Sequence, residues 1–302
     1  MTAGASRGHA AAGDVGWRVP NHPDCLSEEL ALESDTVAAL PSPTAPAADL
    51  PLFPDWTPGQ IHPVGPFAVP GLRSRLVRVY LPRLYTPAEP SFALYLFDGQ
   101  NVFDDAPSFA GGWHAHEAIE RLARRHPAPV VIAIDHGNEA RIEELSPFPY
   151  EEHDGKIDLL LAWLTGTLAP LLSAGLALVP GPYGSVIGGS SMGGLAATYA
   201  HFAHPDTFGG ALVMSPSYWL GDGAIVRWVA ARPRPPVSRV YLDCGLREGK
   251  GTVVRLVTEM ADHLTARGYG CDDLMFRPDA KGAHNERSWR RRLPKALRFF
   301  YR

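Results

Sequence analysis

The stretch YGSVIGGSSMGGLAATYAHF, residues 183–202, decides how this chain folds. Residues 183–189 form an apolar run typical of a buried strand, and residues 192–204 have the composition of a helix. Glycines stand on both sides of Ser190 and Ser191. Glycine at such a junction indicates a backbone conformation or a close approach that a Cβ atom would forbid. The stretch therefore predicts a tight strand-to-helix turn that presents a serine.

Strand-like and helix-like segments alternate on both sides of this turn. The predicted strands are residues 60–69, 74–82, 92–99, 130–135, 183–189, 209–217, 238–245 and 273–279. The predicted helices are residues 114–125, 156–175 (bent near Pro170), 192–204, 224–232, 252–268 and 288–301. The first two strands are expected to be antiparallel. The alternation that follows predicts a mostly parallel sheet covered by helices on both faces.

Length and composition describe an ordinary globular chain. It has 302 residues, of which 45% are hydrophobic and 20% charged, with a formal net charge of -4. We expect one α/β domain over residues 51–302. Residues 1–50 are rich in Ala, Pro, Gly and Ser, and are expected to form a partly unstructured N-terminal extension.

The same properties bear on partners and location. The chain lacks the global basic charge that would recruit nucleic acid or an anionic membrane. No stretch is expected to be long and apolar enough to span a bilayer. The first residues do not have the pattern of a secretory signal, so a cytoplasmic location is expected.

No metal or organic cofactor is expected. The three cysteines, Cys25, Cys244 and Cys271, have no metal-ligand spacing and do not suggest a disulfide framework. His114 and His116 form at most a weak metal pair. The adjacent acids of residues 104–105 are equally weak as a cation site without further oxygen ligands.

The turn itself carries the pattern G-x-S-x-G over residues 189–193, with Ser191 at its centre. In this pattern the serine hydroxyl is held above the end of a sheet. The backbone N–H of Met192 lies at the helix N-terminus and can donate to a developing oxyanion. A phosphate site is disfavoured because no G-x-G-x-x-G and no GK[ST] is present. Ser191 is therefore the predicted nucleophile, and Ser190 is interpreted as a packing residue.

A serine hydroxyl needs a base, and the base needs an orienting acid. His284 fits the base, because it lies in a loop between the last predicted strand and the last predicted helix. The acid is Asp243 or Glu248, and the loop position favours Glu248. The backbone N–H of Gln100, just after the strand of residues 92–99, is the predicted second oxyanion donor.

In these residues the chain resembles the putative-esterase branch of the α/β-hydrolases. This branch includes esterase D-like, siderophore (enterochelin-type), feruloyl and acetyl-xylan esterases and the mycolyltransferases. The segments that carry the resemblance are LYLFDGQNVFDD (94–105), VVIAIDHGNEARIEELSPF (130–148), VIGGSSMGGLAATYAHFAHPDTFGGALVMSPSYW (186–219), VYLDCGLREG (240–249) and GAHNERSWRRRLPKALRFFY (282–301). The resemblance implies the α/β-hydrolase fold.

For the site, the resemblance implies Ser191 as nucleophile, His284 as base, Gln100 and Met192 as oxyanion donors, and an acid in the loop of Glu248. Some relatives work with a serine–histidine dyad, which leaves the role of this acid open. The resemblance also places Arg141 and Glu144 at the substrate pocket and Trp219 in its wall. Asn101, which braces the turn after Gln100, is counted with these substrate-binding residues.

The predicted function is hydrolysis of a small-molecule carboxylic ester through a Ser-His-acid triad and an acyl-enzyme. Two alternatives stay open: an acyltransferase that uses an alcohol or sugar acceptor, and a catalytically silent binding protein of the same fold. No nucleic-acid or membrane partner is expected. The sequence does not predict the oligomeric state or the acyl and alcohol parts of the substrate.

Overall fold

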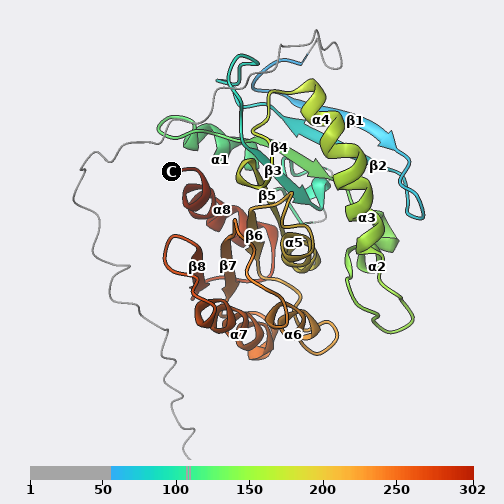
Figure 1. Cartoon of the computed structure of the whole chain (residues 1–302), viewed down its shortest axis with the longest axis vertical. Helices are drawn as coiled ribbons and strands as arrows, with labels where there is room; N and C mark the ends of the chain where they lie inside the picture. Colours follow the sequence, from blue (N-terminus) through green and yellow to red (C-terminus); the bar gives the residue numbers. More distant parts are fainter. Residues whose placement is uncertain (1–55, 107, 109) are drawn as a thin grey trace, which may run out of the picture. The chain divides into compact units, whose positions relative to one another are not determined.

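The computed structural model describes residues 56–106, 108 and 110–302. In this part of the chain eight strands form one sheet in the order β1-β2-β4-β3-β5-β6-β7-β8 (Figure 1). The strands are β1 (Ile61–Phe67), β2 (Arg75–Tyr80), β3 (Ala93–Phe97), β4 (Val130–Ile134), β5 (Ser185–Ser190), β6 (Gly210–Met214), β7 (Arg239–Gly245) and β8 (Leu274–Asp279). The first fifty-five residues, and with them the predicted extension, lie outside the described residues.

Helices cover both faces of the sheet. The α-helices are α1 (Ala115–Leu122), α2 (Arg141–Leu145), α3 (Ile157–Trp163), α4 (Ala169–Gly175), α5 (Met192–Ala203), α6 (Ala224–Ala230), α7 (Thr252–Ala266) and α8 (Glu286–Tyr301). Short helical turns are η2 (Gly99–Asn101), η3 (Asn138–Ala140), η4 (Leu164–Leu168), η5 (Pro182–Gly184) and η6 (Gly249–Gly251). Figure 1 shows α1 and α8 on one side of the sheet and α3 to α7 on the other.

Strand direction brings the functional loops together. β2 runs antiparallel to both β1 and β4, and all other neighbours are parallel. The carboxyl ends of β3, β5, β6, β7 and β8 therefore meet at one edge, where ligands bind in sheets of this kind. The predicted fold class, a mostly parallel α/β sheet with antiparallel first strands, is confirmed.

The period of two along each strand divides the core into two layers. In β3, Tyr95 and Phe97 pack in the layer under α3 to α7, whereas Leu94 and Leu96 pack in the layer under α1 and α8. All five residues of β3 are buried, as expected for a central strand with both faces covered. The central strands are therefore held rigidly under the loops at their carboxyl ends.

Residues 157–175 form one helical stretch with a π-helical turn, η4, between α3 and α4. Pro170 lacks an N–H and crowds the preceding turn, which explains the irregularity just before it. This stretch has a mean hydropathy of 1.5 and is long enough to span a bilayer, so the prediction that no stretch has that character was wrong. Its buried leucines pack in the core of the domain and account for its apolar composition: Leu160, Leu161, Leu164, Leu168 and Leu172.

The cysteines differ from one another. Cys244 is a free, buried thiol in β7, and burial raises its pKa to about 12. Cys271 is disulfide-bonded, a bridge that the sequence did not predict. A single bridge leaves no pattern of spacings in a sequence, which is why composition did not reveal it.

Candidate active site

Ser191 occupies a strained turn between β5 and α5. Its backbone has φ 56° and ψ −121°, a conformation that costs free energy for any residue with a Cβ. A Cβ on Gly189 would lie 2.6 Å from the carbonyl carbon of Gly193, and a Cβ on Gly193 would lie 2.9 Å from a carboxylate oxygen of Asp98. Both glycines are therefore needed for the close approach, and the turn holds the serine at the edge of the sheet.

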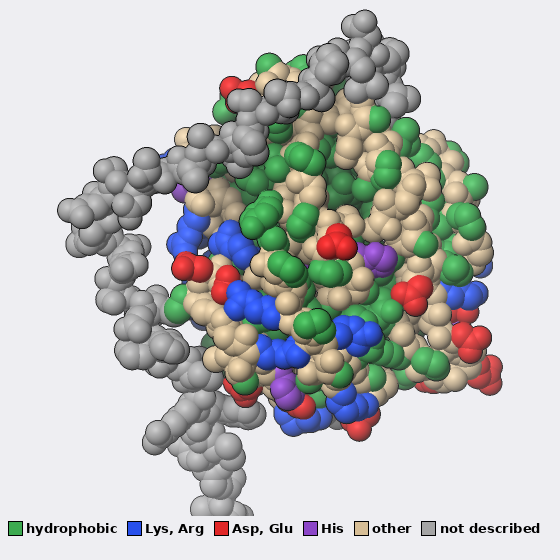
Figure 2. All heavy atoms as spheres, in the orientation of Figure 1, with side chains coloured by type: hydrophobic (Ala, Val, Ile, Leu, Met, Phe, Trp, Pro, Cys, Tyr) green, Lys and Arg blue, Asp and Glu red, His purple; other side chains and the backbone are tan. Residues whose placement is uncertain are grey.

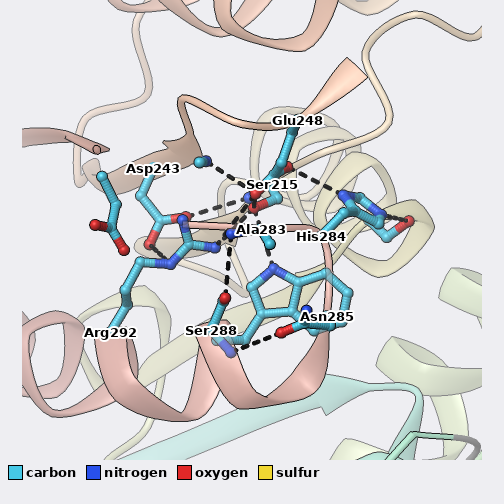
Figure 3. Close-up of polar contacts among 12 residues, drawn as sticks. Ser215, Asp243, Glu248, Ala283, His284, Asn285, Ser288 and Arg292 are labelled. Carbon is cyan, nitrogen blue, oxygen red and sulfur yellow. Dashed lines mark hydrogen bonds and ion pairs between the residues drawn. The ribbon is translucent and has the colours of Figure 1, made fainter. Parts of the chain in front are cut away.

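The structure brings Ser191, His284 and Glu248 together in one hydrogen-bonded chain. His284 Nε2 lies 2.9 Å from Ser191 Oγ, and His284 Nδ1 lies 3.0 Å from Glu248 Oε2. The imidazole is 40% exposed, whereas the Glu248 side chain is fully buried. The imidazole can thus exchange a proton with Ser191 on one side while a buried carboxylate holds it on the other (Figure 3).

The loop that carries His284 is clamped to the start of α8. Asn285 is the N-cap, and its side-chain oxygen accepts from the Ser288 backbone N–H at 3.0 Å. Ser288 Oγ in turn accepts from the backbone N–H of Ala283 at 3.1 Å. Trp289 packs edge-on against the imidazole with ring centroids 5.1 Å apart. The loop of His284 is therefore fixed by the first turn of α8, and Trp289 of that helix packs against the imidazole.

Glu248 is held as a carboxylate. Its Oε1 accepts from the Gly245 backbone N–H at 2.9 Å and from Ser215 Oγ at 2.8 Å. Burial alone would raise the pKa of this carboxyl, but hydrogen bonds from His284 and Ser215, aided by the charge of Arg292, hold the pKa below its ordinary value. With Oε1 occupied, Oε2 is left for His284.

Ser215 is the residue of this site that sequence reasoning missed. Its hydroxyl accepts from Trp289 Nε1 at 3.1 Å and from Arg292 Nη2 at 2.7 Å. Both partners are donors only, so the single hydroxyl hydrogen is left for Glu248 (Figure 3). Ser215 also has φ 42°, and the sequence carries no signal for this conformation.

Asp243, the alternative acid, does not contact His284. It lies in β7 with no exposed surface and accepts from the Tyr241 hydroxyl at 2.9 Å. Arg292 Nε lies 3.3 Å from its carboxylate. Burial raises the pKa of Asp243 to about 7, against the opposing charge of Arg292. Of the two candidate acids, the structure brings Glu248 to the imidazole.

The two predicted oxyanion donors lie at the starts of neighbouring helical turns. Met192 is the first residue of α5 and Gln100 is the second of η2, so neither N–H has a partner within its own helix. The side-chain amide of Gln100 exchanges two hydrogen bonds with the backbone of His136, at 3.0 and 3.2 Å. Gln100 is therefore anchored through its side chain, and its role as an oxyanion donor stays a prediction.

The predicted pocket residues have different surroundings. Arg141 makes a bidentate ion pair with Asp98, at 2.6 and 2.7 Å, and so pins the turn that carries Gln100. Glu144 is 1% exposed and pairs with Arg75 at 3.1 Å, so it is not brought to the site.

Asn101 and Trp219 complete the predicted set. Asn101 braces the η2 turn, because its backbone carbonyl accepts from the Trp113 N–H at 2.8 Å. Trp219 is 42% exposed and follows Ser217, whose hydroxyl lies 3.2 Å from that of Ser191. Its ring packs edge-on against Tyr150, with centroids 5.8 Å apart, so the two rings form one aromatic surface.

Of the two histidines considered for a metal, His114 has other partners, whereas the buried Nδ1 of His116 has no hydrogen-bond partner in the described part of the chain. Among the described residues, no group of three or more His, Cys, Asp or Glu side chains could hold a metal ion. His114 lies between two carboxylates, 2.8 Å from Asp105 and 3.1 Å from Glu117. The hydrogen bond to Asp105 raises the pKa of His114, the effect expected of a paired surface histidine.

A serine on a strand-to-helix turn, followed along the chain by an acid and then a histidine at the same sheet edge, defines the class of α/β-hydrolase enzymes. Residues 72–300 match the family described as "Putative esterase". The chain belongs to this family and is a carboxylic ester hydrolase. No curated protein matches the chain.

Three solved structures with a similar fold are the BES protein, an enterobactin esterase and a siderophore hydrolase. The BES protein from Bacillus cereus has a TM-score of 0.63 and 17% identity, covering 80% of this chain and 94% of that one. The enterobactin esterase FES from Shigella flexneri has a TM-score of 0.61 and 20% identity, and the match covers 85% of this chain and 62% of that one. The siderophore hydrolase EstB from Aspergillus nidulans has a TM-score of 0.55 and 19% identity, and the match covers 88% of this chain and 97% of that one. At these identities the likeness concerns the fold.

Proposed function

We propose that the protein is a serine esterase that works through a triad of Ser191, His284 and Glu248 and an acyl-enzyme intermediate. The single observation that carries the proposal is the continuous hydrogen-bonded chain of the three side chains, with contacts of 2.9 and 3.0 Å. A triad is recognised by such geometry and by the role of each member, and not by sequence position.

In the first half-reaction Ser191 Oγ attacks the ester carbonyl carbon while His284 Nε2 accepts its proton. Glu248 stabilises the imidazolium that forms, because its Oε2 accepts from Nδ1. The tetrahedral intermediate then collapses, the acyl–oxygen bond breaks, and Nε2 returns its proton to the departing alkoxide. The products of this half-reaction are the free alcohol and an ester of Ser191.

The backbone N–H groups of Gln100 and Met192 donate hydrogen bonds to the tetrahedral oxygen and stabilise its negative charge. The dipole of α5 favours negative charge at its N-terminus, next to Met192. Loss of one such donor costs roughly a hundredfold or more in rate. The ion pair of Arg141 with Asp98 therefore acts indirectly, since it fixes the turn on which Gln100 stands.

In the second half-reaction a water molecule takes the place of the alcohol. His284 removes its proton, the carbonyl is attacked again, and Ser191 leaves with the proton restored. The substrate is a small-molecule ester, with Trp219 and Tyr150 as an aromatic wall for one of its parts. The cytoplasmic location and the single domain over residues 51–302 stay predictions.

The proposal is tested by hydrolysis of p-nitrophenyl esters and by mass spectrometry after treatment with a fluorophosphonate probe. Turnover and a single adduct on Ser191 are expected in the wild type, and both should vanish in Ser191→Ala. Ser190→Ala is the matched control, because Ser190 is the adjoining buried serine at the end of β5. An unreacted but folded wild-type protein, or an adduct on another residue, would refute the triad.

A further inference from the structure

A groove of about 770 Å³ lies along the exposed face of α8, beside the loop that carries His284. The residues that line it are Arg121, Lys281, Asn285, Arg287, Ser288, Arg290, Arg291 and Pro294. Five of these eight side chains are cationic and none is acidic. Figure 2 shows Lys and Arg side chains gathered in the lower left part of one face, the region of α8, β8 and α7 in Figure 1.

The cations of this groove are only partly neutralised. Glu117 lies 3.4 Å from Arg290 and 3.5 Å from Arg121, and Asp279 pairs with Arg291. Lys281 and Arg287 have exposed side chains with no carboxylate partner among the described residues. Five cations therefore line the groove, and two of them have no carboxylate partner among the described residues, in a chain whose net charge is -4.

The groove shares a loop with His284, the proposed catalytic base. Asn285, one of its lining residues, directly follows His284, and Lys281 belongs to the same loop. The Asn285–Ser288 clamp and the hydrogen bond of the Lys281 backbone N–H to Asp279, at 3.0 Å, hold this loop in place. The N-terminus of α8 adds positive potential at the same end. The lining residue Asn285 therefore brings one end of the groove to within one residue of His284 along the chain.

We propose that this groove binds an anionic group of the ester substrate, such as a carboxylate or phosphate, so that the preferred substrates are esters with negative charge. This inference rests on the proposed function for its chemistry. Arginine forks suit planar or tetrahedral oxyanions, and an unpaired cation in a groove attracts such a group without first breaking an ion pair. Neutral esters lack this contact and bind through the aromatic wall alone.

Two matched pairs of esters test the proposal. On the acyl side, mono-p-nitrophenyl glutarate is compared with p-nitrophenyl butyrate; on the alcohol side, 4-acetoxybenzoate is compared with its methyl ester. The variant is Lys281→Gln/Arg287→Gln, which removes the two unpaired charges. Arg298→Gln is the control, because Arg298 is exposed in the last turn of the same helix, outside the groove.

The wild type is expected to have a higher kcat/KM for the anionic member of at least one pair. In the double variant this ratio should fall about fivefold or more, and in Arg298→Gln it should not change. The ratio should also fall from about 0.01 M to about 1 M salt, as the screening length shrinks from roughly 30 to roughly 3 Å. A preference for the neutral ester in both pairs, or a ratio equal in all three proteins, overturns the proposal.

A binding measurement tests the groove independently of ester hydrolysis. The Ser191→Ala protein is titrated at equilibrium with each member of the two pairs, with and without the Lys281→Gln/Arg287→Gln changes. Tighter binding of the anionic ester, weakened by these changes, supports the groove even if no ester is turned over. Equal binding in both backgrounds overturns it, whatever the outcome of the hydrolysis assay.

Discussion

Replacement of Ser215 by alanine tests how the acid of the proposed triad is held. The Ser215 side chain is fully buried and makes no contact with the nucleophile among its hydrogen bonds. Its hydroxyl connects two donors on α8 to Glu248 Oε1. The substitution removes the connection and leaves the backbone N–H of Gly245 as the one remaining hydrogen bond to that oxygen.

The magnitude follows from the bond that is lost. A hydrogen bond to a charged group contributes about 1.5–3 kcal/mol. If Glu248 needs this bond to stabilise the imidazolium, kcat falls by roughly 10- to 100-fold, at about 1.4 kcal/mol for each factor of ten. KM should not change, because Ser215 has no exposed surface to offer a substrate. Unfolding stability should also fall, by about 1–3 kcal/mol for each donor left without an acceptor.

The assay is a double-mutant cycle with Ser215→Ala, Glu248→Ala and the double variant, using p-nitrophenyl ester hydrolysis below the unfolding temperature of all four proteins. A residue that acts only through Glu248 has no effect once Glu248 is gone. We therefore expect Ser215→Ala to change kcat by less than about twofold in the Glu248→Ala background.

Two results would refute this reasoning. One is a wild-type kcat in Ser215→Ala, which would mean that Gly245 and the charge of Arg292 suffice to hold the carboxylate. The other is an equal loss of kcat in both backgrounds, which would mean that Ser215 acts through general packing of the site. Thermal unfolding of each variant shows that the proteins compared are folded.

Three further predictions follow from the buried groups around the site. The free energy of unfolding should fall as the pH rises from the ordinary Asp value of 3.8 to about 7, because folded Asp243 keeps a proton that the unfolded chain has lost. Asp243→Asn should remove this part of the slope, which amounts to roughly 3 kcal/mol between about pH 5 and pH 8 at about 1.4 kcal/mol per pH unit up to pH 7, as measured by urea unfolding. Arg141→Met should destabilise the fold by about 3–5 kcal/mol, because it leaves the buried Asp98 carboxylate unpaired, and a denaturation midpoint equal to that of the wild type would contradict this. Gly193→Ala should abolish labelling by a fluorophosphonate, since its Cβ would lie 2.9 Å from an Asp98 oxygen, and retained labelling would show that the turn can relax.

The parts of the fold that sequence reasoning predicted are those with local causes. Hydrophobic periodicity predicted every strand of the sheet, because each strand carries its own pattern of burial. The G-x-S-x-G turn predicted the position of Ser191 because glycine is required within two residues on either side. The order of residues along the chain then limited the predicted partners of Ser191 to a few acids and histidines. In the structure, His284 contacts Ser191 and Glu248 contacts His284.

The parts that were missed depend on contacts between distant segments. Ser215 and Arg292 are 77 residues apart, and nothing near either of them in the sequence indicates their hydrogen bond. Glu144 was predicted at the pocket, yet an arginine at the start of β2 holds it in the interior. The prediction that no stretch is long and apolar enough to span a bilayer was wrong for residues 157–175, whose leucines pack against the sheet.

The dependence of the site on α8 links chemistry to the completion of folding. All eight strands precede α8 along the chain, so the sheet can pair before the helix that supplies Trp289 and Arg292 exists. During synthesis the turn of Ser191 emerges well before the loop of His284. A chain that stops short of α8 therefore has a nucleophile without a clamped base and an acid without its support. In the proposed mechanism, hydrolysis therefore requires the last helix to be packed on the sheet.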